Sequence, residues 1–397
     1  MASERKAVGT AARDVAPKIA PASAHDAMAK AAPASADIPV RAEGRPGKRH
    51  VTINDVARYA DLSIATVSRV MHNSPRVSAE TRQRVLDAIE TLGYTPNALA
   101  RGLAMRSAST IGVLVISIAD PYWAEIVGGI EDYAASEQYA VLIACSYEDA
   151  ARERRAVDLF RQKRVDGVLV GAASGNPDLW QPSQSPGPPV VFINNEHIDH
   201  SIATESEADA LAHRTVPYLV ASDDVRGAIM AVEHLIGLGH RRIAYIGVAG
   251  RASSLRRLEG YKAALQSAAI PIDPRLIVAA GEGANHGEAG AAQLLAAGAT
   301  ALFCYDDMTA LGALRAAHAR GVQVPRQLSI VGYDDVMVSA YFDPPLTTVR
   351  QPMHEMGKTA MRLLVGLLRG EEVAHRAIMP GELVIRASTG PAPNRIL

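Results

Sequence analysis

The chain has 397 residues, of which 48% are hydrophobic and only 5% aromatic, a composition that allows two or three globular domains with aliphatic cores. Its net charge of −1 is unevenly spread: residues 41–106 carry 11 Lys and Arg against 6 Asp and Glu, residues 1–40 sum to +1, and residues 107–397 therefore to −7. A basic front on an acidic body suits nucleic-acid binding at one end, and the absence of a long apolar run in residues 1–49 argues against a signal peptide or membrane helix.

Residues 1–49 are rich in Ala, Pro, Ser and Lys, which predicts a disordered tail. Its basic residues Arg41, Arg45, Lys48 and Arg49 could add non-specific affinity for DNA.

Residues 50–95 have the pattern of a DNA-binding head. Thr52 and Asp55 have the spacing of a capping box for a helix that ends near Ala60. After a tight turn, Ser63 caps a second helix from Ile64 to about His72. The pattern predicts a helix-turn-helix whose second helix is free to enter a major groove. The expected buried positions are Val56, Ala60, Leu62, Val67 and Val70.

A third helix and a hinge complete this region. Ser78 caps the third helix, Gly93 ends it, and Thr95-Pro96 starts a short helical run over residues 97–104. So short a helix is marginal alone, and Gly102 lowers its stability by about 1 kcal/mol relative to Ala. Residues 96–106 are therefore expected to be a hinge that folds conditionally, with an ordinary linker as the alternative.

From Ser109 onward, apolar runs alternate with amphipathic stretches, which indicates buried parallel strands covered by helices. The expected strands are residues 110–118, 139–145, 165–171, 188–194, 241–248, 301–307, 328–335 and 383–389. The expected helices are Tyr122–Ser136, Ala151–Arg164, Arg226–Leu238, Leu255–Ala268, Met308–Arg320 and His354–Leu368. Repeated βα units predict an α/β fold with doubly wound sheets, whose ligand lies beyond the carboxyl ends of the strands. Cys145 and Cys304 lie in such strands and are expected to be buried thiols, which fits a reducing cytoplasm and argues against a disulfide framework.

The segments DVARYADLSIATVSRVM and NSPRVSAETRQRVLDAIETLGYTPNALARGL resemble the amino-terminal signature of the LacI/GalR family of bacterial transcription factors. The resemblance implies base contacts from Ile64, Ala65, Ser68 and Arg69. It implies phosphate contacts from Thr52, Ser63, Thr66, Ser78, Thr81, Tyr94 and Asn97. His72 stands where the family usually has Asn, and Asn73 could substitute for it. The resemblance also implies that the hinge folds when two copies lie side by side on operator DNA, with Leu103 wedged into a minor-groove step.

The base-contact residues differ in what they can recognise. Arg69 can make a bidentate pair with a guanine edge, whereas Ile64 and Ala65 can only touch a thymine methyl group. We therefore expect a relatively large share of the specificity to come from Arg69 and from DNA shape.

The segments DPYWAEIVGGIE, HLIGLGHRRIAYIG, RRLEGYKAAL, DDMTALGALRA, QLSIVGYDD and PPLTTVRQP are similar to the effector-binding core of the same family, which resembles two-lobed periplasmic sugar-binding proteins. This implies an effector-binding and dimerisation domain over residues 107–392. Lobe 1 would take about 109–222 plus 353–382, and lobe 2 about 223–352 plus 383–392. The implied effector-binding residues are Asp120, Tyr122, Trp123, Gly171, Asn194, Ser222, Arg257, Asn285, Asp306, Met308, Asp334 and Met353.

These side chains suit a polyol or a sugar, because aromatic faces pack against the ring while Asp, Asn and Arg pair with hydroxyls. Arg257 could equally hold a carboxylate or a phosphate, which leaves sugar acids and sugar phosphates open. Asp306 stands where the family often has Asn, and the extra carboxylate disfavours an anionic ligand unless Arg257 offsets it.

No metal or cofactor is expected. The stretch over residues 196–216, longer than the family usually has, contains Glu196, His197, Asp199, His200 and His213, but their mixed spacing fixes no metal geometry. The glycine-containing residues 281–290 have neither a Walker lysine nor a GxGxxG pattern after a suitable strand.

The leading interpretation is a cytoplasmic transcriptional regulator, a repressor, that binds a pseudo-palindromic operator as a homodimer under the control of a small-molecule effector and has no membrane partner. The chain closes with Thr389-Gly-Pro-Ala-Pro and no leucine heptads, so a tail-mediated tetramer is not expected. A nucleobase-responsive regulator of the same family is one alternative. A transporter's solute-binding protein would need an export signal, and an enzyme would need a nucleophile elbow, a metal set or a dinucleotide fingerprint, none of which we find.

Overall fold

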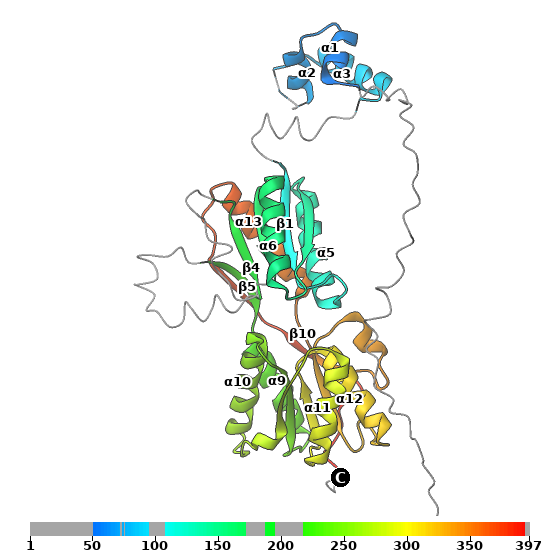
Figure 1. Cartoon of the computed structure of the whole chain (residues 1–397), viewed down its shortest axis with the longest axis vertical. Coiled ribbons are helices and arrows are strands. Elements are labelled where there is room, and N and C mark those ends of the chain that lie inside the picture. Colours follow the sequence, from blue (N-terminus) through cyan, green and yellow to red (C-terminus); the bar gives the residue numbers. More distant parts are fainter. Residues whose placement is uncertain are drawn as a thin grey trace, which may run out of the picture. The chain divides into compact units, whose positions relative to one another are not determined.

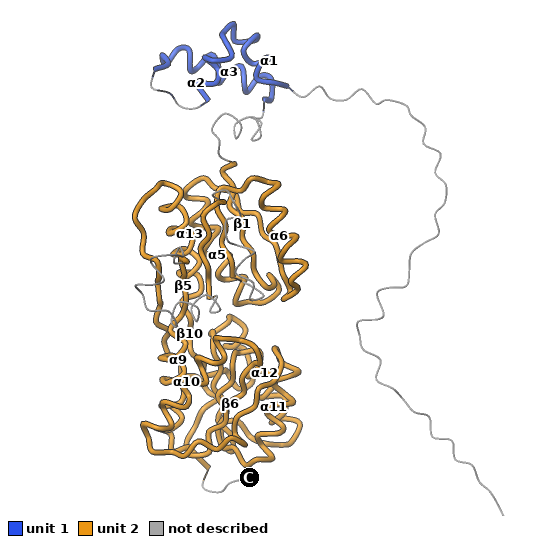
Figure 2. The backbone as a smooth tube through the Cα atoms, turned by 60° about the vertical axis from the view of Figure 1, so that its left-hand side comes forward, with its two compact units in different colours: residues 1–95 blue, residues 96–397 orange. Residues whose placement is uncertain are grey.

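The computed structural model describes residues 51–71, 74, 76–94, 108–171, 187–194 and 217–393. The chain divides into two compact units, residues 1–95 and residues 96–397 (Figures 1 and 2). The tail, the hinge and the 196–216 stretch lie outside the described residues.

The described part of the head contains α1 (Ile53–Tyr59), α2 (Ile64–Met71) and α3 (Ala79–Leu92), as the capping pattern predicts. The Asp55 carboxylate accepts hydrogen bonds from the backbone N–H and the hydroxyl of Thr52, at 2.9 and 2.7 Å. Gly93 ends α3 with a φ of 61°, a left-handed conformation that glycine adopts without strain. The core of the head consists of Val56, Ala57, Ala60, Val67, Val70, Val85, Ala88 and Tyr94, with Leu62 packed partly buried against it.

Two sheets organise the described part of the larger unit, and each defines a lobe. In lobe 1 the strands are all parallel, in the order β2-β1-β3-β4-β5-β11. They are β1 (Thr110–Val115), β2 (Ala140–Cys145), β3 (Gly167–Val170), β4 (Val190–Ile193), β5 (Tyr218–Ser222) and β11 (Arg376–Met379), and the helices are α5 (Pro121–Ser136), α6 (Ala150–Lys163) and α13 (Met353–Leu368).

Lobe 1 is buried on both faces of its sheet. Along β1, Ile111 and Val113 belong to the core under α5 and α13, whereas Leu114 belongs to the core under α6. At Gly112 a side chain would collide with Phe160 of α6, because a Cβ there would lie 2.9 Å from its ring. Apolar residues at successive positions are what a doubly covered strand requires, which explains the uninterrupted run TIGVLV.

In lobe 2 the strand order is β7-β6-β8-β9-β10-β12, with β12 antiparallel to β10. The strands are β6 (Ile243–Val248), β7 (Ile277–Ala280), β8 (Ala301–Cys304), β9 (Ser329–Asp334), β10 (Thr347–Arg350) and β12 (Glu382–Val384). The helices are α9 (Asp224–Gly237), α10 (Ala252–Ser267), α11 (Ala284–Ala296) and α12 (Asp307–Ala319), with the 3₁₀ turns η3 (Pro274–Leu276) and η4 (Met337–Tyr341).

The same alternation holds in lobe 2. In β8, Phe303 packs with the helices α9 and α10, whereas Leu302 and Cys304 pack with α11 and α12. Cys304 is fully buried, as predicted, but Cys145 is only partly buried because β2 is an edge strand. The sequence did not predict β5, β7, β10, β11 or α11 as separate elements.

Within residues 217–393 the chain crosses between the two sheets at three places: after β5, after β10, and between β11 and β12. Neither lobe is therefore a continuous piece of chain. The buried polar residues Ser222, Asp224 and Gln351 lie next to the first two of these crossings.

Candidate DNA-binding and effector-binding sites

The helix α2 presents one face to the core of the head and another to solvent. Val67 and Val70 are buried, while Ile64, Ala65 and Arg69 are exposed, Ile64 to 49%. Ser68 and Thr66 are partly exposed between the two faces. The structure thus places Ile64, Ala65 and Arg69 on one accessible surface, with Ser68 at its border.

Paired hydroxyls lie at the starts of α2 and α3. Ser63 Oγ accepts from the N–H of Thr66 at 3.1 Å, and the two hydroxyls lie 2.8 Å apart. Ser78 and Thr81 repeat this arrangement, at 3.2 and 2.8 Å. Each hydroxyl pair has two hydrogens and uses one between its members, which leaves one to donate to an acceptor such as a phosphate oxygen.

The remaining residues predicted to contact phosphates differ in how accessible they are. Thr52 is exposed but engaged with Asp55, and Tyr94 is only 8% exposed because its ring belongs to the core of the head. His72, Asn73, Asn97 and Leu103 lie outside the described residues.

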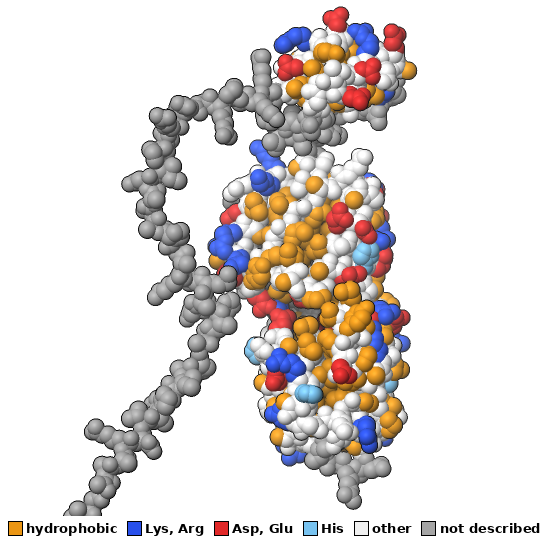
Figure 3. Space-filling model, turned by 90° about the vertical axis from the view of Figure 1, so that its right-hand side faces the viewer, with side chains coloured by type: hydrophobic (Ala, Val, Ile, Leu, Met, Phe, Trp, Pro, Cys, Tyr) orange, Lys and Arg blue, Asp and Glu red, His pale blue; other side chains and the backbone are white. Residues whose placement is uncertain are grey.

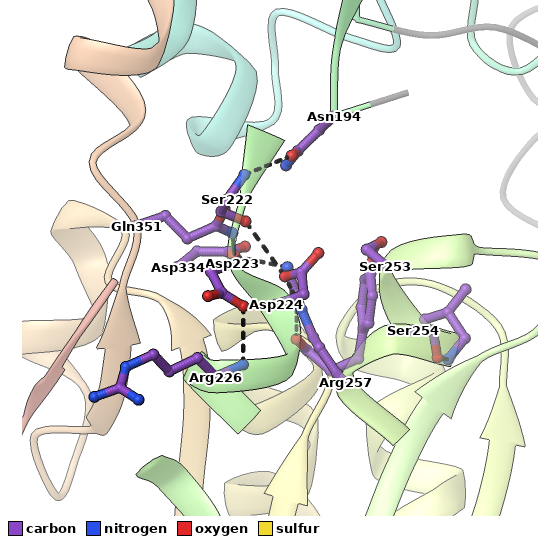
Figure 4. Close-up of polar contacts among 12 residues, drawn as sticks. Asn194, Ser222, Asp223, Asp224, Arg226, Ser253, Ser254, Arg257, Asp334 and Gln351 are labelled. Atoms are coloured by element: carbon purple, nitrogen blue, oxygen red, sulfur yellow. Dashed lines mark hydrogen bonds and ion pairs between the residues drawn. The ribbon is translucent and has the colours of Figure 1, made fainter. Parts of the chain in front are cut away.

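In the larger unit, Arg257 of α10 lies at the centre of a buried polar cluster (Figure 4). Its Nε donates to Asp224 Oδ1 at 2.9 Å, its Nη1 donates to the carbonyl oxygen of Tyr305, and its Nη2 lies 3.7 Å from Asp334 Oδ1. The guanidinium carbon lies 3.7 Å from the centre of the Tyr333 ring and 4.7 Å from that of Tyr305. The guanidinium is therefore surrounded by partners from the protein itself.

Asn194 directly follows β4 and links α5 to the end of β5, the strand after which the chain crosses to lobe 2. Its φ of 47° is left-handed, a conformation that Asn tolerates better than most residues. Its side chain donates to the Tyr122 hydroxyl and accepts from the N–H of Ser222 at 3.1 Å. The structure thus brings together Asn194, Tyr122 and Ser222, three of the residues that the resemblance implies for the effector site.

Trp123, Gly171 and Met353 lie in or against the core of lobe 1. Trp123 is 4% exposed, and a Cβ at Gly171 would lie 2.2 Å from its ring. Met353, 6% exposed, belongs to the same core. Trp123 and Met353, both predicted to contact the effector, are thus packed in the core of lobe 1, with Gly171 against the Trp123 ring.

Two aspartates cap helices from opposite lobes. Asp120 Oδ1 accepts from the N–H of Tyr122 at 3.0 Å, and Asp306 Oδ1 accepts from that of Thr309 at 2.6 Å. Burial raises the pKa of Asp120, and the charge of Asp306 adds to this effect. The two capping carboxylates are therefore within electrostatic reach across the lobes.

Arg251, at the start of α10, reaches the same region. Its guanidinium pairs with Glu148 of lobe 1 and, at 2.9 Å, with Glu282 of lobe 2. Burial raises the pKa of Glu282, Arg251 lowers it, and Asp306 raises it further. Tyr147 and Glu148 both have left-handed φ angles, of 49° and 61°, at the turn that follows β2.

Two other residues predicted to bind the effector lie at the starts of helices of lobe 2. Asn285 is exposed in the first turn of α11, and Met308 is partly buried at the start of α12.

Several polar residues of this region escaped prediction, among them Asp224, Arg251, Glu282, Tyr305, Tyr333 and Gln351. One signal was present in the sequence, a repeated Tyr-Asp-Asp. It directly follows β8 at residues 305–307 and lies at the end of β9 at residues 333–335. In each case the tyrosine lies against Arg257.

In the described ranges, no three His, Cys, Asp or Glu side chains gather as a metal site would require. The same ranges contain no helix that is both long and apolar enough to cross a membrane.

The fold and the sites together define a helix-turn-helix head joined to a two-lobed ligand-binding module. Residues 52–97 match the profile of the bacterial regulatory proteins of the lacI family, and residues 232–389 match that of the periplasmic binding protein-like domain.

Known proteins resemble the chain over most of its length. It is 36% identical over 346 residues to the transcriptional repressor CytR of Escherichia coli strain K12, covering 86% of this chain and 97% of CytR. The structure of the lac repressor dimer bound to operator and the anti-inducer ONPF has a TM-score of 0.73 and 29% identity, covering 86% of this chain and 99% of that one. A complex of the transcriptional regulator CelR with cellobiose has a TM-score of 0.62 and 29% identity, covering 85% and 99%.

The chain belongs to the LacI family. It is a DNA-binding transcriptional regulator with an effector-binding domain, and its relatives are regulators rather than enzymes.

Proposed function

We propose that the protein is a repressor that binds a pseudo-palindromic operator as a homodimer, and that a polyhydroxylated small molecule held between its lobes controls this binding. The observation that carries the DNA-binding part is the exposed face of α2, with Ile64, Ala65 and Arg69 directed away from the core. Operator DNA also sets the place of action, the bacterial cytoplasm.

Symmetry supports the dimer. Each head offers α2 as its recognition helix, so a two-fold pair of heads matches a pseudo-palindrome. Figure 3 shows hydrophobic side chains gathered on one face of both lobes, the kind of surface by which a second copy associates. Exposed apolar side chains of the larger unit include Ile143, Met337 and Tyr341, the last at 82%. The related lac repressor structure is a dimer on operator.

Polar and aromatic side chains at strand ends and helix starts support the effector. Tyr122, Asn194, Asp306 and Asp334 provide an aromatic surface and polar groups for hydroxyls, and the related CelR structure contains cellobiose. β1 is the first strand of lobe 1 after residues 96–106, so a ligand that changes how the lobes close can act on the hinge through lobe 1.

Operator footprinting with matched arginine variants tests the DNA-binding part. Arg69→Ala should reduce discrimination between the operator and a base-changed operator by about 1–3 kcal/mol, because the guanidinium reads a base edge. Arg58→Ala is the control: it removes an exposed arginine, 78% accessible, from α1 and should weaken binding to both DNAs alike. Unchanged operator preference in Arg69→Ala would refute the role of Arg69, and protection of a single half-site would refute the dimer.

A further inference from the structure

The helix α6 gives lobe 1 a strongly basic surface. Residues 150–164, which form α6 and the residue that ends it, carry six Lys and Arg against two Asp and Glu. All six cations are exposed, whereas Glu153 is buried and Asp158 is the one exposed carboxylate of this segment. Residues 107–397 together have a net charge of −7. The outward face of α6 is therefore positively charged within an acidic body.

Three of these cations, Arg161, Lys163 and Arg164, lie at the carboxyl end of α6. The carboxyl end of any helix favours cations, but no other described α-helix of the larger unit has Lys or Arg in its last turn. That general preference therefore does not by itself account for the cluster. None of the ion pairs between described residues includes any of the three.

The carboxyl end of α6 lies where the chain enters lobe 1. Asp166, two residues after Arg164, accepts hydrogen bonds from the N–H groups of Ala108 and Thr110, at 3.0 and 3.1 Å. Its own N–H donates to the carbonyl oxygen of Thr110 at 2.8 Å. Residues 95–107 join the head to Ala108, so DNA held by the head is tethered to this end of lobe 1.

Two carboxylates at this end of lobe 1 are already engaged. Asp166 accepts the two backbone N–H groups, and Glu137, which follows α5, pairs with Arg369. The helices α5 and α13 also cover the other face of the sheet, because they pack in a different core from α6. The cations of α6 are therefore left facing solvent, and duplex DNA, with one negative charge per about 1.7 Å of its axis, is their complement.

We propose that the carboxyl end of α6, through Arg161, Lys163 and Arg164, contacts the phosphate backbone of the DNA that the head holds. This goes beyond the proposed function, because it gives lobe 1 a DNA contact outside the head and the hinge. Phosphates are the same at every base pair, so the contact adds affinity without adding sequence discrimination. The tether raises the effective concentration of the DNA, which lets weak contacts of this kind contribute.

The salt dependence of DNA binding tests the proposal. The probe is a 40-base-pair duplex enriched from a random-sequence pool by the full-length wild type, and fluorescence anisotropy measures binding. In full-length Lys163→Gln/Arg164→Gln, the slope of log affinity against log salt should become shallower by about 2–4, because a dimer loses up to four phosphate contacts. Affinity at 0.1 M salt should fall at least about tenfold. The preference for this duplex over a base-changed one should stay the same.

The matched control is Arg154→Gln/Arg155→Gln. It removes two exposed arginines from the same helix, near the end that follows Glu148, the partner of Arg251 in lobe 2. Ten residues of helix separate Arg154 from Arg164, about 15 Å, which exceeds the screening length of about 10 Å at 0.1 M salt. The control should therefore bind like wild type. Equal effects in both double variants overturn the proposal. So does an effect in neither, which is the result expected if an acidic protein occupies this surface.

Arg164→Gly separates a lost contact from a damaged fold. The φ of Arg164 is 52°, a left-handed conformation that glycine adopts without strain, so this full-length variant should unfold about 1–3 °C higher than wild type. It should nevertheless bind the duplex more weakly and with a shallower salt slope. Wild-type affinity and slope in Arg164→Gly overturn the proposal.

Discussion

At the scale of single residues, buried charged and polar side chains join elements that are far apart in the sequence. Arg257 joins α10 to Asp224 of α9 and to the end of β9, and so ties together three elements of lobe 2. From the sequence, Arg257 could be placed at a strand-end site. Its partners could not be predicted, because Asp224, Tyr305 and Tyr333 come from three separate parts of the chain and only the fold brings them around one guanidinium.

His240 gives lobe 2 a pH dependence. It is fully buried, its ring lies 3.0 Å from Thr300 Oγ1 and 2.9 Å from Ser329 Oγ, and burial lowers its pKa. Because the unfolded state, with a pKa of about 6.5, then binds more protons than the folded state, the free energy of unfolding should fall as pH drops below about 6.5. Urea unfolding of wild type at a series of pH values measures this slope.

Two histidine variants distinguish the contribution of His240 to this pH dependence from that of other titrating residues. His240→Gln should be less stable than wild type at every pH but should flatten the loss of stability on acidification. His318→Gln, at an exposed position of α12, should leave the slope as it is. If both variants lose stability on acidification as steeply as wild type, another group is responsible.

Helix pairs in close contact set the geometry of each lobe at the scale of elements. The helices α5 and α13 cross where Gly129 faces the backbone of His354 and Gly357 faces that of Ile126. A Cβ at Gly129 would lie 1.9 Å from the His354 carbonyl oxygen. No side chain fits between the helices at that point, so their separation is fixed by backbone contact.

Neighbouring glycines of α5 provide a matched test. Gly129→Ala should lower the free energy of unfolding by about 1–3 kcal/mol, because α13 must move away. Gly128→Ala should leave stability unchanged or raise it by up to about 1 kcal/mol, since its Cβ would meet only the His354 ring at 3.8 Å and alanine favours the helix. Chemical denaturation compares the two, and equal effects would rule out the close contact as the cause.

The sequence predicted the helices and strands that have capping residues or long apolar runs, and missed those that have neither. Capping residues gave the head helices, and long apolar runs gave β1, β6 and β9. The helix α11 was missed because its glycines resemble a loop, whereas Gly287 is there because α12 passes 2.2 Å from where its Cβ would be. The edge strands β7 and β11 are short and partly exposed, so they lack the continuous apolar run of a buried strand.

On the scale of the whole molecule, an ion pair joins the lobes. Arg251→Gln should loosen their contact, because it removes the pairing with Glu148 and leaves the carboxylates of both lobes facing one another. Small-angle scattering of the full-length protein at low salt should then show a more extended variant. Arg275→Gln, which breaks a pair within lobe 2, is the control and should scatter like wild type. Identical scattering from all three proteins would show that the pair does not hold the lobes.

The three crossings also determine when each part of the molecule can fold during synthesis. The head is local in sequence and can fold as soon as it is made. Lobe 1 cannot be completed until β11, residues Arg376–Met379, pairs with β5, more than 150 residues after β5 was made. A newly made chain therefore possesses a folded DNA-reading head while the edge of β5 is still open, and stays in that state until residues Arg376–Met379 have been added. Early chain termination would yield a DNA-binding head without its sensor.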